Sequence, residues 1–399
     1  MIFSVFLLSI TFTVGFLLGN KGLQTAYQDP FNVIISRSIP PDKKDLNFNL
    51  FWQVWDTLSG KYFDKARLIQ SKMVYGAIKG MVAALGDPYT VFLPPEENKV
   101  VQEDLSGSFG GVGIRIGFRG TQLAVVAPVP GSPAEKLGIK PGDYIIKITD
   151  ESKGVNIGTV GISLPEAVQA IRGPQGSTVT LTLLRNGDDA PIVADIVRAN
   201  IEVASVEYSF LDDGKTAHIR ILKFAGETYS EWESAVLEIL KNPDVSGIVV
   251  DVRNNPGGFL QSAVDIASEF LENGSLVTTE EGSAERVEFK VERLGRLKNK
   301  KVVVLVNGGS ASASEILAGA LRDVAKISLV GETTFGKGTI QEPQQVEGGA
   351  GLHITIAKWL TPSGFWVDNG GLKPDFEVAD NEETEEDEQL LKAIEVLKS

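Results

Sequence analysis

The chain has 399 residues, of which 43% are apolar and 23% charged, so it is long enough for two or three domains with a substantial core. Its formal net charge of -14 argues against a nucleic-acid partner, because there is no surplus of basic residues to neutralise phosphates. There are no cysteines, which excludes disulfides, thiol nucleophiles and cysteine-based zinc sites.

The N-terminal side chains predict a membrane anchor. The first 20 residues include no charged side chain and are rich in Phe, Leu, Ile and Val. About 20 apolar residues are enough to span a bilayer. Neither a basic start nor an obvious small-residue cleavage site is present, so residues 1–20 favour an uncleaved anchor over a removed signal peptide.

A helical segment is expected next, over residues 45–100, after a polar linker. Apolar residues recur at helical spacing, as at Phe51, Val54 and Leu58. The sequence Gly86-Asp87-Pro88 is a sharp stop signal for the last of these helices. We expect the aromatic and methionine side chains of this segment to form a core and not a cofactor site.

Residues 104–200 change to short strands separated by glycine, which predicts a compact β-rich module with one helix. That helix is expected to begin at Ser163, because Ser163-Leu-Pro-Glu166 has the pattern of a capping box with proline in the first turn. Candidate strands are 113–116, 123–127, 144–148 and 179–184.

Residues 201–380 alternate strands and helices, which predicts an α/β layer with reactive groups at the carboxyl ends of its strands. The expected buried strands are 247–251, 302–306 and 327–330, and the expected helices are 229–240, 260–271 and 314–324. The two histidines, His218 and His353, lie in alternating strand patterns, so ordinary sheet positions are expected for both. Residues 381–399 read as an acidic tail with a short final helix.

Three loops that follow the three buried strands carry the candidate chemistry. In the first, 251–258, the pair Gly257-Gly258 frees the backbone to point amide hydrogens at a ligand, although a plain tight turn would also use it. The second, 307–315, leads into a helix, where a serine would lie beside unpaired backbone donors. Residue chemistry alone does not choose among Ser310, Ser312 and Ser314, and N-capping would need only one of them.

The third loop, 331–338, satisfies the GxxxxGK pattern of a phosphate-binding loop. However, Gly338 occupies the position of the magnesium-binding Ser or Thr, and the following residues read as loop and strand instead of a helix. Lys337 can instead be a general base, provided that burial keeps it neutral; Phe335 and Ile340 are candidate apolar neighbours. A solvated surface lysine is the alternative for an isolated motif.

Together these segments resemble the C-terminal processing peptidases, the S41 tail-specific serine proteases that contain a PDZ domain. The resemblance rests on motifs in the expected order: 85–93 (LGDPYTVFL), 109–114 (FGGVGI), 171–174 (IRGP), 251–258, 310–316 (SASASEI) and 336–341 (GKGTIQ).

The resemblance implies a Ser–Lys dyad of Ser312 and Lys337, with Gln341 orienting the lysine and no metal or cofactor. It implies an oxyanion hole of backbone amides from Gly257, Gly258 and Ala313. It also implies a tail-binding site in the PDZ domain, at Gly111, Val112, Gly113, Ile114 and Arg172, with Arg172 coupling tail binding to assembly of the protease site. As an alternative, Arg172 could simply lie exposed at a helix C-terminus.

The predicted fold is thus an α/β protease domain with a ClpP/crotonase-like layered sheet, an inserted β-rich PDZ domain, an N-terminal helical segment and a membrane anchor. The expected activity is hydrolysis of proteins near their C-termini, with apolar-tailed proteins and the membrane as partners and an extracytoplasmic protease domain. Self-association is left open. A catalytically inactive tail-binding scaffold is the alternative, against which the retained Ser312, Lys337 and Gln341 argue.

Overall fold

The structure is a computed structural model that describes residues 47–185, 190–380, 384 and 386–399. It divides into two compact units. Of the described residues, the first unit comprises 47–98 together with 343–354, and the second comprises those within 99–342 and 355–399. The predicted anchor, residues 1–20, lies outside the described residues. Within the described ranges, no helix is both long and apolar enough to cross a membrane.

The first unit is mainly helical, as the sequence predicts for this segment. Its elements are α2 (Asn49–Lys61), η2 (Lys65–Arg67), α3 (Gln70–Ala83), β1 (Val91–Leu93) and the start of α4 (Pro95–Ser106). Strand β1 pairs antiparallel with the beginning of β18 (Gly351–Leu360), where Phe92 lies opposite Leu352.

The prediction that the aromatic and methionine side chains of this segment form a core is confirmed for Phe92 and Tyr75, which pack with Val82. It is wrong for Phe63 and Met81, which are exposed. Helix α2 has no buried residue, and α3 buries only Val82. Leu50 is 71% exposed and Phe63 89% exposed. The amphipathic face of α2 therefore has apolar side chains that the described chain does not cover.

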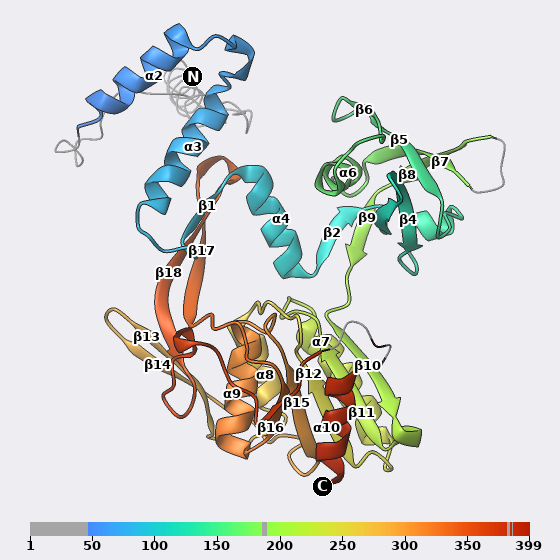
Figure 1. Ribbon diagram of the computed structural model, residues 1–399, viewed down its shortest axis with the longest axis vertical. Helices are drawn as coiled ribbons and strands as arrows, with labels where there is room; N and C mark the ends of the chain where they lie inside the picture. Colours follow the sequence, from blue (N-terminus) through green and yellow to red (C-terminus); the bar gives the residue numbers. More distant parts are fainter. Residues whose placement is uncertain (1–46, 186–189, 381–383, 385) are drawn as a thin grey trace, which may run out of the picture. The chain divides into compact units, whose positions relative to one another are not determined.

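A six-stranded sheet forms the centre of the α/β part of the second unit (Figure 1). Its order is β10 (Val206–Leu211), β11 (Thr216–Ile221), β12 (Gly247–Asp251), β15 (Lys301–Val306), β16 (Ser328–Gly331) and β19 (Phe376–Glu377). From β11 to β19 all neighbours are parallel, and β10 pairs antiparallel with β11. The expected strands 247–251, 302–306 and 327–330 are confirmed to within one or two residues.

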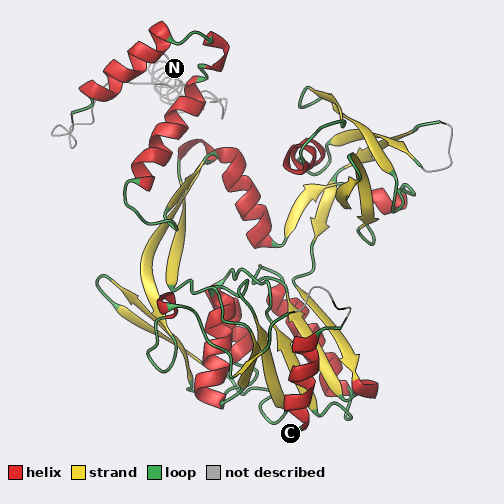
Figure 2. Ribbon diagram, viewed as in Figure 1, coloured by secondary structure: helices red, strands yellow, loops and turns green. Residues whose placement is uncertain are grey.

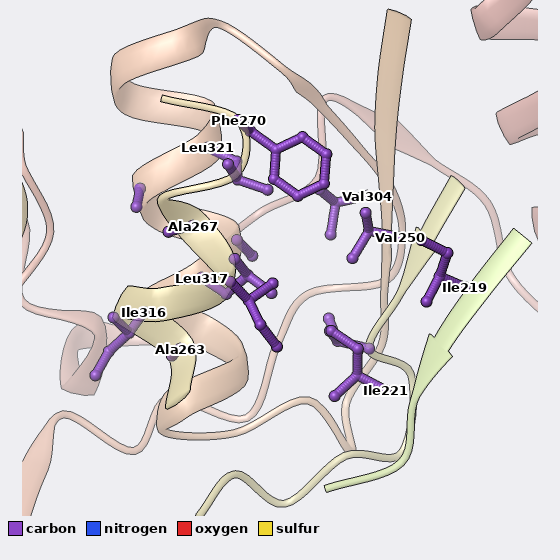
Figure 3. Packing of buried hydrophobic residues seen from close by; sticks show 14 of the residues in the cluster. Ile219, Ile221, Val250, Ala263, Ala267, Phe270, Val304, Ile316, Leu317 and Leu321 are labelled. Atoms are coloured by element: carbon purple, nitrogen blue, oxygen red, sulfur yellow. The ribbon is translucent and has the colours of Figure 1, made fainter. Parts of the chain in front are cut away.

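Helices cover both faces of this sheet, because alternate residues of its strands are apolar on both sides. Ile248 and Val250 belong to the large cluster that includes α7 (Thr228–Lys241), α8 (Leu260–Ala267) and α9 (Ala313–Ala325). Val249 belongs to the cluster around the C-terminal helix α10 (Glu388–Lys398). Figure 3 shows Leu317 and Leu321 of α9 directed toward Val250 and Val304 of the sheet, and Ala263 and Ala267 on α8 belong to the same cluster.

A second sheet borders this layer. Strand β13 (Leu276–Gly282) pairs antiparallel with both β14 (Arg286–Lys290) and the end of β18, and β17 (Thr339–Gln345) pairs with β18. Strand β17 follows the GxxxxGK sequence directly. A helix would be needed there for a phosphate-binding loop, so the rejection of that motif is confirmed.

The β-rich module is a further part of the second unit, and it consists mainly of strands (Figure 2). Its elements are β2 (Ser108–Gly111), β3 (Ile114–Arg119), β4 (Gln122–Pro128), α5 (Pro133–Lys136), β5 (Tyr144–Asp150), β6 (Val155–Gly158), α6 (Leu164–Ile171), β7 (Thr178–Leu184), β8 (Ile192–Val197) and β9 (Ala199–Glu202). Ser163 caps α6 in the predicted capping box with Glu166.

A buried ion pair holds this module together. Arg198 and Asp150 have side chains with 0% exposure and lie 2.6 Å apart. Arg198 also donates to the carbonyl of Ile171 at 2.7 Å, which satisfies a backbone acceptor at the end of α6.

Candidate active site

The three candidate loops meet at one edge of the six-stranded sheet, because they follow the neighbouring parallel strands β12, β15 and β16. Hydrogen bonds join the first two loops. The Ala311 amide donates to the Asn255 carbonyl at 3.0 Å, and the Asn254 amide donates to the Asn307 side chain at 2.8 Å. Gly309 approaches Asn254 so closely that a Cβ at Gly309 would lie 2.8 Å from the Asn254 Cα.

The structure distinguishes among the three serines. The hydroxyls of Ser310 and Ser314 are fully buried and donate to the carbonyls of Val252 and Asn255, at 2.8 and 2.9 Å. Ser312 is only partly buried, and among the described residues its hydroxyl donates to no acceptor. Ser310 and Ser314 therefore join the loops, whereas the Ser312 proton is available to a base.

Ser312 has a strained backbone at the start of α9. Its φ is 54° and its ψ is -114°, outside the usual regions for a residue with a side chain. Strain of this kind is common at active sites, where surrounding contacts hold it. Here the helix begins at the next residue, so the positive end of the α9 dipole lies beside Ser312.

The Gly257-Gly258 turn packs directly against the serine loop. A Cβ at Gly257, whose φ is +100°, would lie 2.8 Å from the Ala311 oxygen and 2.9 Å from the Ser312 Cβ. The side chain of Asn255, fully buried, accepts a hydrogen bond from the Gly257 amide at 2.9 Å and donates to the Ile221 carbonyl at 2.7 Å. Only a residue without a side chain fits at this position.

Two of the three predicted oxyanion-hole amides are available. In the described part of the chain, the amides of Gly258 and Ala313 donate to no acceptor. The Gly257 amide already donates to Asn255, so Gly257 contributes to this site through its shape and the close approach that it allows.

Glu315, for which no role was predicted, joins loop 307–315 (the serine loop) to loop 331–338 (the lysine loop). Its Oε2 accepts the backbone amides of both Ser312 and Lys337, each at 2.9 Å. Its Oε1 accepts the Gly336 amide at 2.8 Å and the Thr334 hydroxyl at 2.5 Å. The two residues of the predicted dyad are thus held through a single carboxylate oxygen.

The carboxyl of Glu315 is fully buried in this position. Burial raises its pKa, and the hydrogen bonds from Thr334, Lys337, Gly336 and Ser312 act in the opposite direction without cancelling the effect of burial. Lys337 itself is partly buried.

Gln341 lies on β17, where its side-chain amide donates to the hydroxyls of Thr339 and Thr355 at 2.9 and 3.2 Å. These bonds fix its side chain between β17 and β18. Its predicted contact with Lys337 stays a prediction.

A second polar network lies at the start of the first loop, around Asp251 and Arg253. Arg253 bridges two carboxylates, because its Nη2 donates to Asp251 Oδ2 at 2.8 Å and to Asp387 Oδ2 at 2.7 Å. His218, which was expected at an ordinary sheet position, lies on β11 with Nε2 3.1 Å from Asp251 Oδ2. Burial alone would raise the pKa of Asp251, but hydrogen bonds from His218 and Arg253 outweigh it and lower the pKa to about 2.

The predicted tail-binding residues line one groove of the β-rich module, with a volume of about 280 Å³. Gly111, Val112, Gly113, Ile114 and Arg172 are all among its lining residues. The other lining residues are mainly apolar: Phe109, Arg115, Ile116, Leu164, Val168 and Ile171. Gly113 has a φ of +74°, and a Cβ there would lie 2.2 Å from the Ser132 Cβ.

Arg172 is not simply exposed at the end of α6. Its guanidinium carbon lies 3.9 Å from the centroid of the Phe109 ring, and its Nη1 lies 3.6 Å from Oε2 of Glu103 on α4. The arginine is therefore held at the groove by an aromatic face and a carboxylate.

No cluster of metal-ligating side chains is present within the described ranges. Sequence reasoning missed Asn255 and Glu315, which are both fully buried and both take part in hydrogen bonds of the candidate loops. One sequence signal for Glu315 was available: it is an acidic residue three positions after Ser312, with no basic residue close to it in the sequence.

Three family models match the chain. The model described as "Peptidase family S41" covers residues 215–378, "PDZ domain" covers 125–185, and "Activating protease CtpB N-terminal domain" covers 22–97. The chain is 37% identical over 332 residues to the carboxy-terminal processing protease CtpA of Bacillus subtilis, which covers 83% of this chain and 68% of that protein. It is 38% identical over 331 residues to a CtpA-like serine protease of Staphylococcus aureus, covering 82% of this chain and 64% of that one.

A solved structure shares the fold. An S41 protease of Bacteroides fragilis aligns with a TM-score of 0.50 at 18% identity, over 77% of this chain and 83% of that one. At this identity the likeness concerns the fold alone.

Proposed function

The chain belongs to peptidase family S41, and we propose that it is a serine endopeptidase that uses Ser312 as nucleophile and Lys337 as general base to cleave proteins near their C-termini. The observation that carries this proposal is the single Glu315 oxygen that accepts the backbone amides of both residues. This arrangement keeps a hydroxyl at the head of a helix beside the loop of a lysine, as a serine–lysine mechanism needs.

The reaction is acyl transfer. The Ser312 hydroxyl attacks a peptide carbonyl while neutral Lys337 takes its proton, and the resulting oxyanion lies toward the free amides of Gly258 and Ala313. Lys337 then protonates the leaving amine. Water attacks the acyl-enzyme with Lys337 again as base, which releases the new C-terminus and restores the Ser312 hydroxyl. Gln341 orients the lysine.

The PDZ domain supplies the choice of substrate. The amides of the loop at Val112–Ile114 receive the terminal carboxylate, and the tail adds as a strand along the groove. Apolar lining from Ile116, Leu164 and Val168 favours a tail with apolar side chains. Arg172 couples occupation of the groove to assembly of the protease site.

The surroundings of the enzyme are a further part of the proposal. The uncharged residues 1–20 anchor the chain in a membrane, with the protease domain on the extracytoplasmic side. The uncovered apolar residues of α2 and α3 favour self-association through the first unit. Removal of residues 1–20 should release the protein from the membrane fraction, and Leu50→Asp should reduce the mass measured by light scattering.

Cleavage of a model protein with an apolar C-terminal tail tests the activity. Wild type should degrade it faster than the same protein with an acidic tail. Ser312→Ala and Lys337→Ala should abolish cleavage, and Ser310→Ala is the matched control because it removes a structural hydroxyl two residues away and should retain turnover. If the wild-type protein binds the apolar tail but does not cleave the protein that carries it, the inactive scaffold is favoured instead.

Arg172→Ala should weaken the preference for the apolar tail. The comparison of initial rates on the two tails measures this preference directly. An unchanged preference would remove Arg172 from the regulatory role.

A further inference from the structure

Two tryptophans hold the carbonyl groups of the lysine loop. The indole N–H of Trp359 donates to the Lys337 oxygen at 3.0 Å, and the indole N–H of Trp366 donates to the Gly338 oxygen at 2.9 Å. Trp359 lies on β18 and is fully buried, whereas Trp366 follows the turn at 361–364 and is partly buried. The apolar pair Phe365-Trp366 has no part in the function described so far.

Trp366 packs directly on Gly338. A Cβ at Gly338 would lie 2.4 Å from the Trp366 Nε1 and 2.7 Å from its Cδ1. The φ of Gly338 is not in the left-handed region, so the close approach of the indole and not the backbone conformation explains the glycine. The backbone amide of Trp359 also donates to the Gly338 oxygen, at 3.0 Å.

The turn before Trp366 is itself fixed. Asp323 of α9 accepts hydrogen bonds from both the amide and the hydroxyl of Ser363, at 3.0 and 2.6 Å. The Thr361 amide donates to the Phe365 carbonyl at 3.0 Å, which closes the turn. Trp366 is therefore supported by α9, the same helix whose N-cap is Ser312.

We propose that Trp366 is a positioning residue for catalysis, which, together with Trp359, fixes the backbone on which the base Lys337 is mounted. Glu315 accepts the amides of Gly336 and Lys337, and the tryptophans donate to the carbonyls of Lys337 and Gly338. Polar backbone groups of this loop are thus held from two sides. A loop with glycine on both sides of the lysine needs such support, because glycine restricts the backbone least.

The consequence for catalysis follows from geometry. A general base must lie within hydrogen-bond reach of the proton that it takes, and a displacement of about 1 Å can reduce the rate by about a hundredfold. Loss of one indole bond should let the loop move and leave the partly buried Lys337 more exposed to water. The proposed mechanism needs a neutral base, and greater exposure to water favours the protonated form of a lysine.

This inference rests on the proposed function, and the test uses the full chain with an apolar-tailed substrate. Trp366→Phe removes the N–H donor and keeps an aromatic ring. It should lower kcat about tenfold with little change in KM, and should move the acid limb of the kcat–pH profile to higher pH. Gly338→Ala, whose Cβ would displace the indole, should shift the profile in the same direction.

Trp232→Phe is the matched control. The indole nitrogen of Trp232 is buried and has no hydrogen-bond partner within the described part of the chain, so this substitution changes ring size without loss of an N–H bond. It should lower the melting temperature and leave the pH profile in place. Circular dichroism verifies that each variant is folded at the assay temperature.

The outcomes separate the two claims. If Ser312→Ala and Lys337→Ala cleave like wild type, the proposed function fails, whatever Trp366→Phe does. If those two are inactive while Trp366→Phe keeps both the wild-type kcat and the wild-type pH profile, Trp366 is a packing residue only and this inference is overturned.

Discussion

Gly257→Ala should reduce both stability and activity, because the turn at Gly257 lies against the serine loop, 307–315. The new Cβ would lie 2.8 Å from the Ala311 oxygen, 2.9 Å from the Ser312 Cβ and 3.1 Å from the Ala313 nitrogen. Its φ of +100° would cost an alanine about 1–2 kcal/mol. Overpacking adds about 1–3 kcal/mol, so we expect a total loss of about 2–5 kcal/mol.

Gly274→Ala separates the two contributions. Gly274 also has a positive φ, of +83°, but a Cβ there would meet nothing within 4 Å. This control should therefore lose only the conformational part, about 1–2 kcal/mol. Urea unfolding of both variants, followed by tryptophan fluorescence, measures the difference.

The two variants, Gly257→Ala and Gly274→Ala, should differ more strongly in kcat than in stability. Relief of the clash at Gly257 requires the turn to move, which displaces the neighbouring Gly258 amide from the position proposed for it in the oxyanion hole. Loss of one oxyanion-hole donor costs about 10²–10³ in kcat, whereas Gly274→Ala should keep the wild-type kcat. Equal stability loss and equal kcat in the two variants would refute the packing of this turn against Ser312.

Two further substitutions test the buried charges. Asp150→Asn should destabilise the PDZ domain by about 3–5 kcal/mol, because it leaves the guanidinium of Arg198 buried without its carboxylate. Calorimetry should show a lower melting temperature for this variant. An unchanged melting temperature would show that the ion pair does not stabilise the domain. Asp251 has a folded pKa of about 2, below its ordinary value of 3.8, so its contribution to stability is present above pH 3.8 and is lost as the pH falls through 2. The stability difference between wild type and Asp251→Asn, measured by urea unfolding, should therefore shrink by about 2 kcal/mol from pH 5 to pH 2; a difference independent of pH would show that His218 and Arg253 do not stabilise the ionised form.

The sequence predicted the elements of the α/β sheet and of the PDZ domain well, since their signals are local. The run at 302–306 is apolar on both faces, as a strand covered on both sides must be, and the capping box at Ser163 marks the start of α6. The order of three loops after three such strands also placed the candidate dyad at one sheet edge.

Contacts between distant residues could not be predicted in this way. Ser310, Ser312 and Ser314 have equivalent local sequences, and only the carbonyls of Val252 and Asn255 distinguish the structural hydroxyls from the available one. The prediction of a core in the helical segment was partly wrong for a related reason. Helical spacing shows that a face is apolar, but it does not show whether the same chain buries that face.

The missed residues illustrate the same limit. Glu315 is an ordinary acid in the first turn of a helix when read locally. Its role depends on the amides of Gly336 and Lys337, which the fold brings from more than 20 residues away.

We expect Lys337 to lie within reach of the Ser312 side chain and to control its proton. Since the chain has no cysteine, Ser312→Cys introduces a single thiol whose ionisation can be followed by the pH dependence of its alkylation. With Lys337 present, the thiolate should pair with the ammonium group and the thiol pKa should fall below about 8.5; with Lys337→Met added, it should rise again. The same alkylation profile with and without the lysine would contradict the account.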